Sequence, residues 1–282
     1  MNNNSDAILS LLKDPDNATF EAMVESMTFD IPTLENLWQQ ADDEIAISRL
    51  DWLIHHTRFN QLAERLSEWR SKNGGMLEGV WLAASYQYPE LAFAEIDDAV
   101  TCIAKDVWLE LRDDMTPQEK IAAINRILFG KYGFKSDKQN RTSINNMLLN
   151  NVLRTRKANH LAMLILYVSV AEKLKIPLSV VTLFRALRVA YMDDNAPDKD
   201  KGIAFYIEPF EKGLMFDHDI AKLTITRQGV PFDPKYIQIC TNNIIIRGFL
   251  IEMMMLYAEK GMRAKAEDMA KLQTIFNDSN IQ

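Results

Sequence analysis

Hydrophobic residues recur at helical spacing through most of the first 112 residues. The stretch "SDAILSLLKD" begins with a Ser/Asp cap and places Ile8, Leu11 and Leu12 on one helix face. The same spacing continues in four further stretches, 14–27, 31–41, 42–56 and 58–75. The last of them ends in a double glycine, which is a strong helix stop. The pattern predicts short helices stacked as hairpins of the solenoid kind, although no exact repeat period is present.

Two more helical stretches follow. Pro89 divides the block 77–114, because proline begins helices well and interrupts them badly. In "TPQEKIAAINRILFGKYGF", Thr116 is a predicted N-cap and Pro117 occupies the first helical position. Glu119, three residues after the cap, completes a capping box. This sequence predicts a helix that begins at 117 and ends at the glycines that follow.

The hydrophobic pattern changes after residue 178. Residues 178–194 and 202–210 are rich in β-branched and aromatic residues, and they flank the polar loop "DDNAPDKDKG". This order predicts a hairpin with a long, solvated connection. Two final helices, 241–259 and 262–278, are separated by "KGM". They are similar to one tetratricopeptide-like hairpin, which as a single copy cannot form an array.

Charge and composition exclude several classes of protein. The 282 residues carry a formal net charge of −7, with both signs interspersed, which argues against a nucleic-acid-binding surface. Two cysteines do not suggest a disulfide framework. The longest apolar run is too short to span a bilayer, and no basic segment followed by an apolar stretch opens the chain. We therefore expect a cytoplasmic protein with no membrane or nucleic-acid partner.

Three stretches carry a resemblance to a known family. They are "INRILFGKYGF" at 124–134, the segment 145–178 around "ANHLAMLILYVSVAEKLKIPL", and "FYIEPFEKGLMF" at 205–216. Together they resemble the transglutaminase-like superfamily, in particular its bacterial SirB-type branch. In that branch helical segments precede the core and a tetratricopeptide-like tail follows it, an order that this chain matches.

The resemblance implies a fold and its boundaries. We expect a mostly α (α+β) protein with an all-helical region at 1–115, a reduced transglutaminase-like core at 116–240 and a helical hairpin at 241–282. In the core, the 158–175 helix is expected to pack against strands near 180–191 and 203–208 of a small antiparallel sheet.

The superfamily's chemistry is a Cys-His-Asp arrangement, in which a nucleophile at a helix N-terminus is activated by an imidazole that a carboxylate orients. Its SirB-type branch usually has serine as the nucleophile. Registering the central helix on Tyr167 and Pro177 places the nucleophile at Ala162. The same register, continued without a gap, places the histidine at Ala186 and the carboxylate at Glu208. Two of the three catalytic groups are then absent.

This loss predicts a pseudoenzyme that acts as a binding or scaffolding module for a protein partner, without metal or cofactor. An acyl-transfer or peptide-hydrolysing enzyme, with its catalytic residues misregistered, is the alternative. If the register is right, Ala162, Ala186 and Glu208 converge at the N-terminal end of the central helix. We expect Glu208 either to pair with His160, Arg185 or Arg188, or to face solvent.

Overall fold

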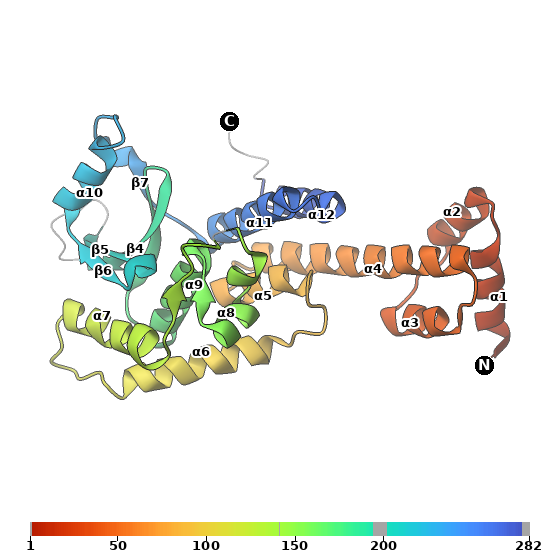
Figure 1. Cartoon of the computed structure of the whole chain (residues 1–282), viewed down its shortest axis with the longest axis horizontal. Coiled ribbons are helices and arrows are strands. Elements are labelled where there is room, and N and C mark those ends of the chain that lie inside the picture. The colour runs from red at the N-terminus through yellow and green to blue at the C-terminus, as the bar shows by residue number, and fades with distance from the viewer. Residues whose placement is uncertain (1, 141, 194–201, 278–282) are drawn as a thin grey trace. The chain divides into compact units, whose positions relative to one another are not determined.

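Figure 1 shows the computed structural model of the chain, which describes residues 2–140, 142–193 and 202–277. Residues 1–67 and 68–282 form two compact units. The described residues are mostly helical, with one small antiparallel sheet, as the sequence predicts. No helix among them is long and apolar enough to cross a membrane.

The first unit is a bundle of helices. It contains α1 (Asn2–Lys13), α2 (Asn17–Ser26), α3 (Ile31–Gln40) and most of α4 (Glu44–Ser71). Leu12, Leu34 and Leu50 lie in its core, each almost completely buried. The sequence predicted two helices where α4 runs without a break. No glycine or proline interrupts residues 44–71, so nothing in the chain stops the helix.

The second unit surrounds α9 with helices. Those that precede it are α5 (Met76–Ser85), α6 (Phe93–Trp108), α7 (Pro117–Asn125), the π-helix η1 (Arg126–Lys131), the short η2 (Ile144–Asn146) and α8 (Leu149–Thr155). The capping box of Thr116 and Glu119 at the start of α7 is confirmed. The central helix α9 (His160–Lys173) is buried from Leu161 to Ala171, because α5, α6, α8 and the sheet contact it. Its continuous apolar sequence reflects this burial on all sides.

The sheet has five antiparallel strands in the order β6-β5-β4-β3-β7. They are β3 (Leu178–Leu183), β4 (Ala186–Met192), β5 (Ile203–Glu208), β6 (Leu214–Phe216) and β7 (Ile237–Ile239). A separate pair, β1 (Lys135–Ser136) and β2 (Lys157–Ala158), is parallel. The predicted pairing of the strands around the 193–202 connection is confirmed, while residues 194–201 of that connection lie outside the described residues.

The 178–194 stretch forms two strands, because the chain turns at Phe184 and Arg185. Phe184 adopts a left-handed conformation with φ of 60°, and its N–H donates to the carbonyl of Tyr236 at 2.8 Å. Turns are usually marked by Gly, Asn or Pro, and this one contains none of them. Because a bulky residue rarely takes the left-handed conformation, the sequence did not indicate a turn here.

Both faces of the sheet are covered. Helix α9 lies against β3 and β4, which confirms the expected packing on the strands near 180–191. On the other face, Ala221 and Ile225 of α10 (His218–Thr226) pack with Val181, Leu183 and Tyr206. The short helices η3 (Pro209–Glu211) and η4 (Pro234–Tyr236) precede β6 and β7.

The C-terminal hairpin is confirmed as α11 (Asn242–Glu259) and α12 (Arg263–Thr274). These helices pack on each other, and α11 also packs on α5. The second compact unit therefore contains the hairpin, the residues of the expected core, and α5 and α6 from the expected N-terminal region.

Candidate functional site

A cavity of about 840 Å³ opens at the N-terminal end of α9. Its wall is formed by the first turn of α9, the start of β4, the β5–β6 connection, α10 and α11. These elements come from residues far apart in the sequence. The cavity volume lies within the range of about 300–1,000 Å³ that is typical of ligand-binding sites.

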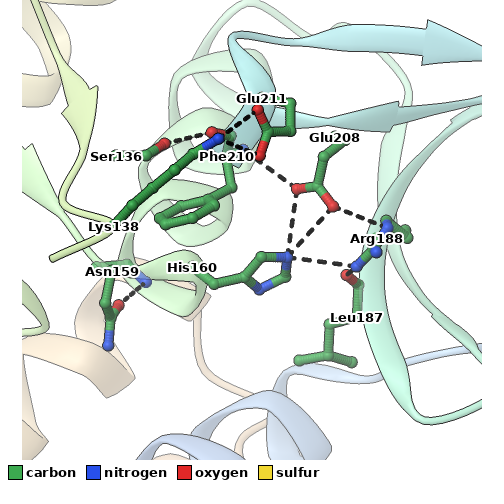
Figure 2. A network of polar contacts seen from close by, with 10 residues as sticks. Ser136, Lys138, Asn159, His160, Leu187, Arg188, Glu208, Phe210 and Glu211 are labelled. Carbon is green, nitrogen blue, oxygen red and sulfur yellow. Dashed lines mark hydrogen bonds and ion pairs between the residues drawn. The ribbon is translucent and has the colours of Figure 1, made fainter. Parts of the chain in front are cut away.

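Glu208 is the central acidic group of this site (Figure 2). It ends β5, where the strand register pairs it with Leu214 of β6, and the neighbouring residue Ile207 pairs with Val189 of β4. The side chain is buried, with an exposed fraction of 8% for the residue. Its Oε2 atom lies 2.8 Å from Arg188 Nε, and its Oε1 atom accepts a hydrogen bond of 3.1 Å from the backbone N–H of Phe210. The carboxylate is therefore held by partners on both of its oxygens.

His160 is the first residue of α9, and its ring faces the same carboxylate. Its Nε2 atom lies 3.2 Å from Glu208 Oε1 and 3.3 Å from Arg188 Nη1. An Nε2 atom that carries a proton donates to Glu208, whereas an unprotonated one accepts from Arg188. The buried carboxylate favours the protonated Nε2, because an ionised acceptor gives the stronger hydrogen bond. Arg188 Nη1 then donates to the Leu187 carbonyl, 2.7 Å away.

These contacts change the pKa of Glu208. Burial by itself raises the pKa of this carboxyl, but the hydrogen bond and charge of His160, the charge of Arg188 and the Phe210 N–H together lower it below its ordinary value. Glu208 is therefore ionised at neutral pH. The three side chains form a compact cluster in which one anion faces a guanidinium and an imidazole.

Asn159 holds the start of α9 in place. Its Oδ1 atom caps the helix by accepting from the Ala162 N–H at 2.9 Å, and its backbone N–H donates to the Asn146 carbonyl at 2.7 Å. Its Nδ2 atom donates to Glu252 Oε1 of α11 at 2.7 Å. One buried amide thus ties the site helix to the preceding loop and to the C-terminal hairpin.

The turn after β5 depends on a glycine. Gly213 has a φ of 72°, and a Cβ atom there would lie 1.9 Å from Asn125 Oδ1. Asn125 donates to the Gly213 carbonyl at 3.0 Å and accepts from the Tyr167 hydroxyl at 2.8 Å. On the same turn, Glu211 pairs with Lys138 at 2.7 Å, and the Phe210 carbonyl accepts a hydrogen bond from Ser136 Oγ (Figure 2).

The family model for the transglutaminase-like superfamily matches residues 94–250, more than half of the chain. The chain belongs to the transglutaminase-like superfamily. No curated protein and no solved structure matches it significantly. The matched range contains α9, the whole sheet and the first half of α11, and so includes most of the cavity wall.

Within this transglutaminase-like domain, the structure brings together most of the residues singled out from the sequence. Ala186, Arg185 and the His160–Arg188–Glu208 cluster all line the cavity. The expected pairing of Glu208 is confirmed for His160 and Arg188. Arg185 instead places its guanidinium over the Phe184 ring, 5.1 Å from the centroid.

Ala162 lies elsewhere on α9. It is fully buried and is not among the residues that line the cavity. Residues 160 and 162 are separated by about 200° around the helix axis, so only one of them can face Glu208. In this structure His160 occupies the helix-terminal position that faces the carboxylate.

The sequence analysis missed several residues of the site, three of which matter for its polar contacts and its open space. Asn159, Gly248 and Glu252 all line the cavity. A polar residue before an apolar helix is a cap signal that the sequence offered for Asn159. Gly248 and Glu252 also stand out within the apolar run 244–257, but no pattern in the neighbouring sequence connected them to the core.

The chemistry open to this site is limited by its side chains. Among the described residues that line the cavity there is no cysteine or serine, and the hydroxyl of Thr224 donates to its own helix at the Ile220 carbonyl. Cys102 lies exposed on α6, and burial raises the pKa of the Cys240 thiol. In the described part of the chain, no group of three or more His, Cys, Asp or Glu side chains is placed to hold a metal ion.

Proposed function

We propose that this protein is a non-catalytic member of the SirB-type branch, a pseudoenzyme whose former active-site cavity binds a protein partner. The observation that carries the proposal is the identity of the residue at the helix terminus. His160, instead of a thiol or hydroxyl group, faces Glu208 and Arg188. Ala186 contributes only a methyl group to the same cavity.

Acyl transfer needs a nucleophile with a general base beside it. The imidazole of His160 is already engaged with Glu208 and Arg188, and the cavity wall, as far as the structure describes it, offers no thiol or serine hydroxyl for the imidazole to activate. The cluster has the contacts of a structural ion pair, which holds α9 against the end of the sheet. This arrangement supports loss of the acyl-transfer reaction.

Two features support binding in place of catalysis. The cavity is large enough for a side chain or a short peptide segment. Leu214 and Ile220, which line it, are large hydrophobic residues with exposed fractions of 60% and 50%. Exposed apolar side chains at the edge of a concave site are typical of interaction surfaces. We further propose that 116–240 is the reduced core and that the flanking helices serve as scaffold.

The first test measures catalysis directly. The purified chain is incubated with acyl-glutamine and peptide substrates, and both amine incorporation and hydrolysis are followed. We expect no turnover above buffer. Turnover that His160→Ala abolishes would refute the pseudoenzyme proposal and favour the acyl-transfer or peptide-hydrolysing alternative.

The second test measures binding at the cavity. A photo-crosslinking amino acid is placed at position 214 in the cavity wall, and the matched control carries it at Trp108, which is also exposed but lies on α6. We expect a crosslinked polypeptide in native lysate only for the cavity position. Equal crosslinking at both positions would count against a specific site.

A further inference from the structure

Two residues on one face of α11 complete the cavity wall. Gly248 and Glu252 are separated by four positions, so they lie one above the other on the helix surface. Glu252 lies outside the range matched by the superfamily model. Gly248 lies inside that range, close to its end.

Gly248 has no structural reason to be glycine. Glycine in a helix interior destabilises the helix relative to alanine, and this residue has the ordinary negative φ. A Cβ atom built at this position would meet nothing within 4 Å. The glycine therefore leaves open space beside Glu252, at a cost in helix stability that packing does not explain.

Glu252 differs from the other carboxylates of the cavity. Glu208 faces Arg188 and His160, and Glu211 pairs with Lys138. Glu252 is half-buried and receives one hydrogen bond, from the neutral amide of Asn159, and no ion pair among the described residues. Burial raises the pKa of its carboxyl, although the nearby His160 opposes this effect. The group is a partly desolvated carboxylate without a cation of its own.

We propose that Glu252 receives a basic side chain, lysine or arginine, from the polypeptide that binds in the cavity. The space beside Gly248 admits the charged end, and Leu161, Leu187 and Phe210 in the cavity wall suit the methylene stem. This inference rests on the proposed binding function and names the chemistry of the partner.

An acidic ligand held by Arg185 is the competing possibility. Arg185 is exposed and has no carboxylate partner in the described part of the chain, but a solvated guanidinium loses little by remaining unpaired. A half-buried carboxylate is stabilised more by a counter-charge than a solvated guanidinium is, because water screens the charge of the buried group less. The balance therefore favours a cation at Glu252.

The test uses three acetylated pentapeptide amides with the sequences Gly-Leu-X-Leu-Gly, where X is arginine, lysine or the neutral arginine isostere citrulline. Affinity is measured by the shift of the backbone amide resonance of residue 248 in the full chain. We expect one of the cationic peptides to bind at least about tenfold more tightly than the citrulline peptide. The stronger of the two identifies the side chain.

Three variants locate the effect. Glu252→Gln should bring the ratio of the affinities for the cationic and the citrulline peptide down to about one. The matched control Glu211→Gln should retain the preference for the cationic peptide, because the Glu211 carboxylate already pairs with Lys138 in the wild type. Gly248→Leu should weaken all three peptides, because the side chain fills the space. A preference that survives Glu252→Gln, or equal affinity for all peptides, would overturn the inference.

The two proposals fail in different ways. Position-specific crosslinking at 214 without any preference for a basic peptide would overturn only the assignment of a basic side chain to Glu252. Turnover of acyl substrates would refute the non-catalytic function itself.

Discussion

Replacing Glu208 tests how the cluster at the start of α9 contributes to stability. The carboxylate is 11% exposed in its side chain and Arg188 is 20% exposed, so the pair lies largely out of solvent. Removing one partner of a buried ion pair costs about 3–5 kcal/mol. Glutamine keeps an oxygen that can accept a hydrogen bond from the Phe210 N–H or from Arg188. We therefore expect Glu208→Gln to lower the free energy of unfolding by about 2 kcal/mol and Glu208→Ala to lower it by about 3 kcal/mol.

The assay is urea unfolding at equilibrium, followed by near-UV circular dichroism, with Glu211→Gln as the matched control. That residue forms an exposed pair with Lys138, and we expect a change of less than about 0.5 kcal/mol. The double variant Glu208→Leu/Arg188→Met should recover much of the loss, because it leaves no unpaired buried charge. Equal effects for Glu208→Gln and Glu211→Gln would refute the assigned burial and pairing.

The pH dependence has a definite sign. Because the folded pKa of Glu208 is lowered, its contribution is present above the unfolded pKa, near the ordinary value of 4.5, and is lost as pH falls through the lower folded value. The difference in unfolding free energy between the wild type and Glu208→Gln should therefore be constant near neutral pH and shrink below about pH 4. A difference that grows on acidification would contradict the direction of the shift.

Three further predictions follow from neighbouring residues. Gly248→Ala should stabilise the chain by about 0.5–1 kcal/mol in the same unfolding assay, since the added methyl group meets no neighbour; destabilisation would show that the space is not open. Asn159→Ala should lower the free energy of unfolding by at least about 1 kcal/mol, because the helix cap is lost. Asn159→Asp should recover only part of this loss, because it places a second carboxylate beside Glu252. Full recovery of the unfolding free energy would count against the contact with Glu252. The last comparison uses a background in which both native cysteines are replaced. There His160→Cys/Ala186→His should react with iodoacetamide at neutral pH faster than Ala162→Cys/Ala186→His, because residue 162 is buried. The reverse order of reactivity would support the register that places the nucleophile at Ala162.

The sequence alone determined the local elements. The capping box at Thr116 and Glu119 depends on residues three apart, and the two C-terminal helices depend on spacing within each segment. Strand composition likewise identified the chain on either side of the 193–202 connection. The resemblance also selected Glu208, because the residue lies in a compact stretch with a recognisable turn and a glycine that the turn requires. Each of these inferences uses interactions between near neighbours in the chain.

Only the tertiary structure decided which side chains meet. His160 and Ala162 both lie in the first turn of α9, and the packing of that helix determines that His160 faces Glu208 while Ala162 is buried. Glu252 joins the cavity because the hairpin returns to the start of α9, where Asn159 binds it. Contacts between residues so far apart depend on the rotation and register of whole elements. Those are set by the burial of complete faces, and no short pattern in the sequence encodes them.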